Sequence, residues 1–173
     1  MSIDFVGSQT TFSGIAAPRV SLTFSVAKRF MDVAVSLALL PLVAVCAVLF
    51  LVMNPIPNRG RLFFRQIRMG RGGRAFVVYK FRSIKPGHGE ISGPYGPVET
   101  SCITPLGRAL RRSRIDELPQ VINVLLGNMS LIGPRPDCIH HARFYLRDVP
   151  DYRAQLGVRP EIRGYAQTEV GYA

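Results

Sequence analysis

The chain has 173 residues, a formal net charge of +11 at pH 7 and three cysteines. This length fits one domain with its own core. The cysteines are too few and too widely spaced for a disulfide framework or a metal cluster, which favours a reducing compartment. The positive charge, nearly all arginine, predicts an anionic partner: nucleic acid, a phosphate-bearing substrate or anionic lipid.

The first part of the chain predicts a leader followed by a membrane segment. Residues 1–25 are rich in serine and threonine without a clear hydrophobic period, so we expect a poorly ordered leader. Residues 33–53 carry no charge over 21 positions, and such a helix is about 30 Å long, enough to cross a bilayer. The run is too long and begins too late for a cleaved signal peptide.

Pro41 and the basic flanks decide how residues 26–53 are expected to meet the membrane. Pro41 lies in the middle of the apolar run and predicts a kink. Basic residues flank both ends of the run, and cytoplasmic segments are the ones enriched in Lys and Arg. A re-entrant helix that enters and leaves by the cytoplasmic face satisfies both flanks, whereas an ordinary kinked span is the alternative. The flanking residues are Lys28, Arg29, Arg59, Arg61, Arg65 and Arg68.

A small β-hairpin is predicted next. Residues 61–66 and 74–81 read as two short strands, residues 71–73 as their turn, and residues 85–101 as a loop. Lys80 and Arg82 follow an apolar run and are predicted to point into a phosphate-binding site. A solvated patch facing lipid headgroups is the alternative. Nucleic acid is disfavoured because few aromatic residues lie near the basic stretch.

A basic amphipathic helix is predicted from Thr104 and Pro105, as cap and first-turn residue, to just before Asp116. Such helices lie in the plane of the headgroups. Arg111 is predicted to reach the acids that follow. Alternatively, all the arginines of this helix serve as surface anchors.

Asp116 and Glu117 are predicted to begin the following helix, which Gly127 ends. Its expected buried face consists of Leu118, Val121, Ile122 and Leu125. Adjacent helical residues diverge by about 100°, so one acid can attack while the other holds a cation. An aspartate near several arginines stays ionised and available as a nucleophile. Alternatively, the two acids only cap the helix and favour its dipole.

Arg135 lies between two prolines, in the sequence GPRP. Proline fixes the local backbone, and a preorganised guanidinium binds phosphate bidentately at low entropic cost. A rigid turn with a solvent-facing arginine is the alternative. The histidines, His88, His140 and His141, show no metal-binding pattern and are predicted to be surface or interface residues.

Several motifs, taken in order, resemble the bacterial sugar transferase family. They are KRFMD at residues 28–32, FRQxRxG at 64–70, YKFRS at 79–83, DELPQ at 116–120, NVL at 123–125 and MSLIGPRP at 129–136. The resemblance covers roughly residues 28–167.

The resemblance implies an α+β, mainly helical, monotopic membrane protein. It has a re-entrant N-terminal helix, amphipathic interfacial helices and a small β-hairpin. Residues 54–173 would form the catalytic domain, on the cytoplasmic face of the bacterial inner membrane. The family uses a nucleotide diphosphate-sugar, usually a UDP-sugar, undecaprenyl phosphate and Mg²⁺, and makes the first lipid-linked sugar of an exopolysaccharide or similar glycan.

The resemblance also implies residue roles. Asp116 would attack the sugar-bearing phosphate and release UMP, and the polyprenol phosphate would then take the phosphosugar from the aspartyl intermediate. Glu117 would bind the metal, and Arg111 and Arg135 would hold phosphates.

The sequence departs from the family pattern in three places. Arg114 stands where a small polar residue is usual, and Glu161 and Arg163 stand where a glycine and a threonine are usual. Glu161 and Arg163 add charge there, and they could pair with one another. Relatives also continue beyond the last residue, so we expect a domain that is less stable than its relatives, with low or no turnover although the acids are present. An inactive membrane scaffold and a membrane-tethered nucleic-acid binder are the alternatives to an enzyme, and the sugar and the oligomeric state are not predicted.

Overall fold

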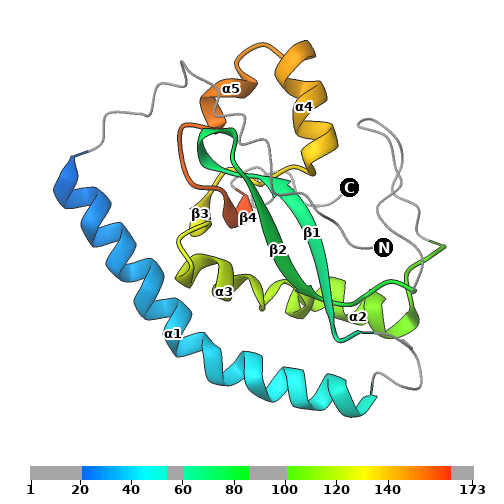
Figure 1. Ribbon diagram of the computed structural model, residues 1–173. Helices are drawn as coiled ribbons and strands as arrows, with labels where there is room; N and C mark the ends of the chain where they lie inside the picture. The colour runs from blue at the N-terminus through cyan, green and yellow to red at the C-terminus, as the bar shows by residue number, and fades with distance from the viewer. Residues whose placement is uncertain (1–20, 54–60, 86–100, 165–173) are drawn as a thin grey trace.

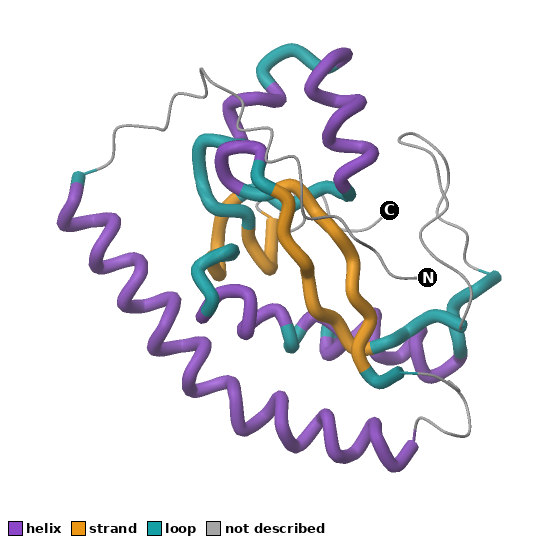
Figure 2. The backbone as a smooth tube through the Cα atoms, in the orientation of Figure 1, coloured by secondary structure: helices purple, strands orange, loops and turns teal. Residues whose placement is uncertain are grey.

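The computed structural model describes residues 21–53, 61–85 and 101–164 (Figure 1). The described chain is mainly helical, with two small two-stranded sheets (Figure 2). In chain order the elements are α1 (Leu22–Met53), β1 (Phe63–Met69), η1 (Arg71–Gly73), β2 (Ala75–Phe81), α2 (Pro105–Ser113), η2 (Ile115–Glu117), α3 (Gln120–Leu125), β3 (Ser130–Gly133), α4 (Ile139–Asp148), α5 (Tyr152–Gln155) and β4 (Glu161–Gly164).

Helix α1 is a single long apolar helix that includes Pro41. It begins at Leu22 rather than at residue 26, so residues 22–25 are helical and not part of a leader; residues 1–20 lie outside the described residues. Figure 1 shows α1 bending near its middle, as the internal proline predicts. Its length and hydropathy suffice to cross a membrane.

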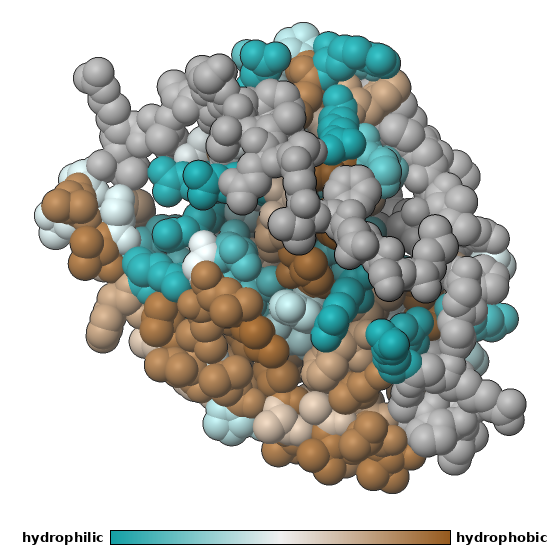
Figure 3. All heavy atoms as spheres, viewed as in Figure 1, coloured by the Kyte–Doolittle hydropathy of each residue, from teal (hydrophilic) through white to brown (hydrophobic). Residues whose placement is uncertain are grey.

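The outer face of α1 is the main exposed apolar surface. Of the eighteen large hydrophobic residues that are exposed in the described chain, fourteen belong to α1. They gather along the lower edge of the molecule (Figure 3). A contiguous apolar surface of this kind marks a contact with lipid or with another protein.

The N-terminal half of α1 is attached to the rest of the protein by polar contacts. The Arg29 guanidinium donates to the carbonyls of Val124 and Leu125 at the C-terminal end of α3, at 2.7 and 3.2 Å. Asp32 is buried, and its carboxylate accepts hydrogen bonds from the Ser130 hydroxyl at 2.7 Å and the Leu131 amide at 3.2 Å. Lys28 pairs with the same carboxylate at 3.3 Å. These contacts satisfy both the buried acid and the orphan carbonyls of α3.

The C-terminal half of α1 is attached by apolar packing. Val43 and Cys46 are buried in one cluster with Phe81 of β2 and Val121 of α3. The Phe50 ring meets the Phe81 ring edge-on, with 5.0 Å between their centroids. Both halves of α1 therefore contact the same domain.

The predicted hairpin is confirmed, with a shift in its first strand. Strands β1 and β2 pair antiparallel from Phe63 opposite Phe81 to Met69 opposite Ala75, and η1 forms the turn. Strand β1 begins and ends later than the strand predicted at residues 61–66. Pairing that continues up to a tight turn must include Met69, because the turn sets the register of both strands.

Helix α2 has the predicted N-terminal cap. The Thr104 hydroxyl accepts a hydrogen bond from the Gly107 amide at 2.9 Å, and Pro105 follows in the first turn. Gly107 faces the hairpin end so closely that a Cβ there would lie 1.9 Å from the Ser83 carbonyl oxygen. The close approach brings the arginines of α2 next to the end of β2.

The prediction that the acidic pair begins an α-helix is wrong. Asp116 and Glu117 lie in the 3-10 turn η2, which follows Arg114 in the left-handed region at φ 61°, and α3 begins only at Gln120. Pro119 explains the difference, because it has no N–H with which to extend an i→i−4 ladder. The amides of Glu117 and Leu118 instead donate to the carbonyls of Arg114 and Ile115. Gly127, at φ 83°, follows the end of α3 as predicted.

The buried face of α3 is wider than predicted, because α3 packs against both α1 and β2. Val121 and Val124 are fully buried, whereas Leu118, Ile122 and Leu125 are half-buried. Asn123 is also fully buried: its side-chain oxygen accepts from the Tyr79 amide at 3.1 Å, and its amide nitrogen donates to the Val77 carbonyl at 2.6 Å. The asparagine thus supplies β2 with the partners of a neighbouring strand.

The last part of the described chain was not predicted. Strands β3 and β4 pair in parallel although they lie about thirty positions apart, and α4 and α5 pack on the turn of the hairpin through Met69, Ala142 and Leu156. Four-residue strands carry too little periodicity to be recognised. His140 is exposed and His141 half-buried on α4, as expected, while His88 lies outside the described residues.

We expect Asn123→Ala to lower the free energy of unfolding by about 2–4 kcal/mol, because it leaves a buried amide and a buried carbonyl of β2 without partners. Asn128→Ala, at an exposed position just beyond α3, is the matched control and should change it little. Thermal unfolding of the detergent-solubilised variants measures both. Equal melting temperatures for the two variants would show that the Asn123 contacts contribute nothing.

Candidate active site

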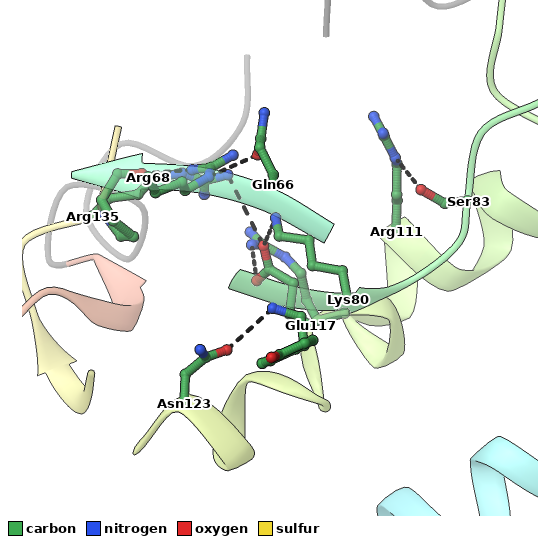
Figure 4. Close-up of polar contacts among 11 residues, drawn as sticks. Gln66, Arg68, Lys80, Ser83, Arg111, Glu117, Asn123 and Arg135 are labelled. Carbon is green, nitrogen blue, oxygen red and sulfur yellow. Dashed lines mark hydrogen bonds and ion pairs between the residues drawn. The ribbon is translucent and has the colours of Figure 1, made fainter. Parts of the chain in front are cut away.

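The carboxylate of Glu117 lies at the centre of a cluster of cations (Figure 4). One oxygen is 3.1 Å from the Lys80 ammonium and 4.0 Å from the Arg135 guanidinium, and the other is 3.5 Å from the Arg114 guanidinium. Lys80 comes from β2, Arg114 from the end of α2 and Arg135 from the turn after β3. Segments far apart in the sequence therefore converge on one acid.

Burial and charge act on this cluster in opposite directions. Burial alone would raise the pKa of Glu117, but the charges of Lys80 and Arg135 outweigh it and hold the pKa below its ordinary value. The pKa of Lys80 is lowered by its burial and by the positive charge of Arg68. Glu117 is therefore a carboxylate at neutral pH.

Asp116 is buried beside this cluster with one oxygen unused. Its Oδ1 atom has no hydrogen-bond partner. Burial raises the pKa of Asp116 to about 6, against the opposing charge of Lys80. Asp116 is therefore mainly ionised at pH 7 and poorly solvated.

A small cavity lies next to the cluster. Its lining includes Lys80, Glu117 and Arg135, as the sequence predicts, but not Asp116. Three further polar residues line it that were not proposed as site residues: Arg68, Gln120 and Glu161. Arg68 is buried, and it donates to the Gln66 side chain at 2.8 Å and to the Pro136 carbonyl at 2.5 Å. The sequence signal for Arg68 is its place in the FRQxRxG motif at residues 64–70, where several other basic residues lie nearby.

Two predicted phosphate ligands lie elsewhere. The Arg82 side chain donates to the Arg61 carbonyl at 2.8 Å, beyond the end of β2, and Arg82 is not among the residues that line the cavity. Its role in phosphate binding stays a prediction. Arg111 donates to the Ser83 hydroxyl at 2.9 Å and stands apart from the Glu117 cluster (Figure 4). Its charge still lowers the pKa of Asp116, so Arg111 lies near the acid at another edge of the site.

Glu161 is the unexpected member of the site. It begins β4, is 1% exposed, and its carboxylate accepts a hydrogen bond from the Gly133 amide. Its Oε1 atom has no hydrogen-bond partner. Burial raises the pKa of Glu161 to about 7, against the opposing effect of the Gly133 hydrogen bond. The carboxylate thus bonds the backbone of the turn after β3, while the side chain of Arg163 lies outside the described part.

The acidic side chains of the site fit Mg²⁺ only where substrate phosphates and water complete its coordination. Within the described ranges, no group of three or more acidic, histidine or cysteine side chains could hold a metal ion. Mg²⁺ is usually held by one or two carboxylates together with water and substrate phosphates. Glu117 is a carboxylate of this kind, and the adjacent Asp116 keeps one oxygen without a hydrogen-bond partner.

A comparison with known protein families gives a match over most of the chain. The model of the bacterial sugar transferase family matches residues 23–173. The chain belongs to the bacterial sugar transferase family. The match includes the elements that carry Lys80, Glu117 and Arg135.

Similar proteins come from several bacteria. A UDP-N-acetylgalactosamine-undecaprenyl-phosphate N-acetylgalactosaminephosphotransferase of Aeromonas hydrophila is 38% identical over 84% of this chain and 34% of its own length. A UDP-glucose:undecaprenyl-phosphate glucose-1-phosphate transferase of Caulobacter vibrioides is 37% identical over 87% of this chain and 55% of its own length. An exopolysaccharide production protein PSS of Rhizobium leguminosarum is 37% identical over 82% of this chain and 73% of its own length. The chain thus spans about a third to a half of the length of the first two relatives.

We expect stability to depend on pH through Glu161. Its pKa is about 7 when folded and near its ordinary 4.5 when unfolded. Between these values the folded state holds the proton more tightly, so the free energy of unfolding falls as pH rises from about 4.5 to about 7. Glu161→Gln cannot ionise and lacks this contribution, which is roughly 1–3 kcal/mol.

Melting temperatures at pH 5 and pH 8 check this. The melting temperature of Glu161→Gln minus that of wild type should be more positive at pH 8 than at pH 5. The titration of Asp116 does not affect this difference, because both proteins contain Asp116. If the difference in melting temperature between the two proteins is the same at both pH values, the raised pKa of Glu161 is contradicted.

Proposed function

We propose that this chain transfers a sugar 1-phosphate from a UDP-sugar to undecaprenyl phosphate, the first step of exopolysaccharide or related glycan synthesis. The observation that carries the proposal is the buried pair of acids beside Lys80 and Arg135, which joins a carboxylate nucleophile to a cationic phosphate site. The names of the relatives support this substrate class. They give no support to a scaffold or a nucleic-acid binder.

The cations of the cavity bind the diphosphate. Arg68, Lys80 and Arg135 line it together, so a substrate with two adjacent phosphates meets three positive charges in a partly desolvated space. In the absence of substrate, Glu117 neutralises part of this charge. The diphosphate displaces that interaction and places the sugar-bearing phosphorus near the acids.

Asp116 then acts as the nucleophile. A carboxylate oxygen of Asp116 forms a bond to the sugar-bearing phosphorus while the bond from that phosphorus to the bridging oxygen breaks, and UMP leaves with the bridging oxygen and its electron pair. The product is an aspartyl-phosphosugar. A phosphate oxygen of undecaprenyl phosphate attacks the same phosphorus, which returns Asp116 as a free carboxylate. Lys80 and Arg135 stabilise the charge on the phosphoryl oxygens in both steps.

Glu117 would hold Mg²⁺, and the ion would supply positive charge to the diphosphate. This chain's own part is to keep Glu117 ionised, which the charges of Lys80 and Arg135 do against the effect of burial.

The contacts of α1 support a re-entrant membrane arrangement. Its N-terminal half bonds to α3 and β3, and its C-terminal half packs on β2 and α3, so both halves remain on the same side of the domain. A straight span would carry one half away from the domain. We therefore propose that residues 26–53 re-enter the cytoplasmic face of the inner membrane and that residues 54–173 form the catalytic domain there, which also brings the lipid-borne acceptor to the site.

We expect Asp116→Asn to abolish UMP release from UDP-sugars because the amide is not a nucleophile. Asp148→Asn, at an exposed aspartate of α4, is the matched control and should retain full activity. Intact-protein mass spectrometry with the UDP-sugar should show a phosphosugar adduct on the control and none on Asp116→Asn. Full turnover by Asp116→Asn would exclude Asp116 as the nucleophile.

Thiol labelling of intact cells tests the membrane arrangement. Ser25→Cys and Arg61→Cys introduce exposed thiols on either side of the apolar segment, in a background without the three native cysteines. Both should be protected from a membrane-impermeant reagent added outside and should react after permeabilisation. Labelling of one position but not the other in intact cells would demonstrate a span.

A further inference from the structure

Glu161 holds two successive residues of the turn that carries Arg135. Its carboxylate accepts a hydrogen bond from the Gly133 amide, and its own backbone amide donates to the Pro134 carbonyl at 3.0 Å. Arg135 is the next residue. The two bonds therefore connect the start of β4 to the backbone directly before the phosphate-binding guanidinium.

The backbone at this point leaves little freedom. A Cβ at Gly133 would lie 2.7 Å from the Arg159 carbonyl oxygen, so the turn presses against the segment that leads into β4. Pro134 and Pro136 restrict the backbone on both sides of Arg135. A carboxylate bonded to the Gly133 amide adds the restraint that fixes the turn against β4.

The side chain of Glu161 is also part of the cavity. It is 1% exposed, lines the cavity together with Lys80, Glu117 and Arg135, and leaves Oε1 without a hydrogen-bond partner. A buried acid without full hydrogen bonding is costly, and its charge interacts with that of Arg135. A residue needed only for packing would not require a carboxylate in this place.

We propose that Glu161 is a positioning residue of the phosphate site, which holds the Gly133–Pro134 backbone so that the Arg135 guanidinium faces the bound diphosphate. The proposal rests on the proposed function, because it assumes that Arg135 binds the diphosphate of the donor. Glu161 acts through Arg135 and touches no reacting atom. Its effect is therefore on affinity for the nucleotide diphosphate, and it disappears when Arg135 is absent.

A double-mutant cycle measured by calorimetry with UDP alone, at constant Mg²⁺, tests this. Glu161→Met fills the buried space without an acceptor for the Gly133 amide and should weaken UDP binding roughly tenfold, as the loss of a well-placed charge-assisted contact does. Glu161→Gln retains an acceptor oxygen and should remain within about threefold of wild type. In an Arg135→Ala background, Glu161→Met should change the dissociation constant less than about twofold.

Three results would overturn the proposal: equal affinities for wild type and Glu161→Met, equal weakening by Met and Gln, or the same fold-change with and without Arg135. If Glu161→Met unfolds, Glu161→Ala takes its place with the same expectations. If both unfold while Glu161→Gln folds, Glu161 serves stability alone and the proposal fails. Absence of UDP binding by the wild type would instead contradict the proposed function itself.

Discussion

The ion-pair cluster around Glu117 is the interaction on which the rest of the domain depends. A buried carboxylate is tolerated only where cations and hydrogen bonds satisfy it, and here Lys80, Arg114 and Arg135 come from three different parts of the chain. Each of these elements has its own attachment: Asn123 joins α3 to β2, Gly107 lets α2 approach the end of β2, and Glu161 bonds the turn after β3. Each of these attachments thus holds an element that carries one of the cations.

Helix α1 connects this cluster to its surroundings. Arg29 bonds to the end of α3, and Asp32 bonds to the start of β3. Strand β3 leads directly to the turn that carries Arg135. The opposite face of α1 is apolar and exposed. The same helix therefore contacts the elements around the site on one face and exposes an apolar surface on the other, which is the surface that the proposed membrane arrangement would place in lipid.

Features with a local cause could be predicted from the sequence, and features with a non-local cause could not. The hairpin, the Thr104 cap and the bend at Pro41 follow from residues close in sequence, and the acids and Arg135 were found because their motifs are contiguous. The 3-10 turn at Asp116 depends on Pro119 three positions later, and the α-helical pattern concealed it. From the sequence, Glu161 was expected only to add charge to a compact turn. Its place in the cavity depends on the parallel pairing of β3 with β4, which is not visible in the sequence.

Nucleotide release in the absence of acceptor tests the central claim most directly. If the carboxylate beside the cationic cavity takes the phosphosugar, the purified chain mixed with a UDP-sugar and no undecaprenyl phosphate should release close to one equivalent of UMP per active protein and then stop. Addition of the acceptor should restart release. The absence of any UMP until the acceptor is present would show direct transfer between the substrates and would contradict the assignment of Asp116.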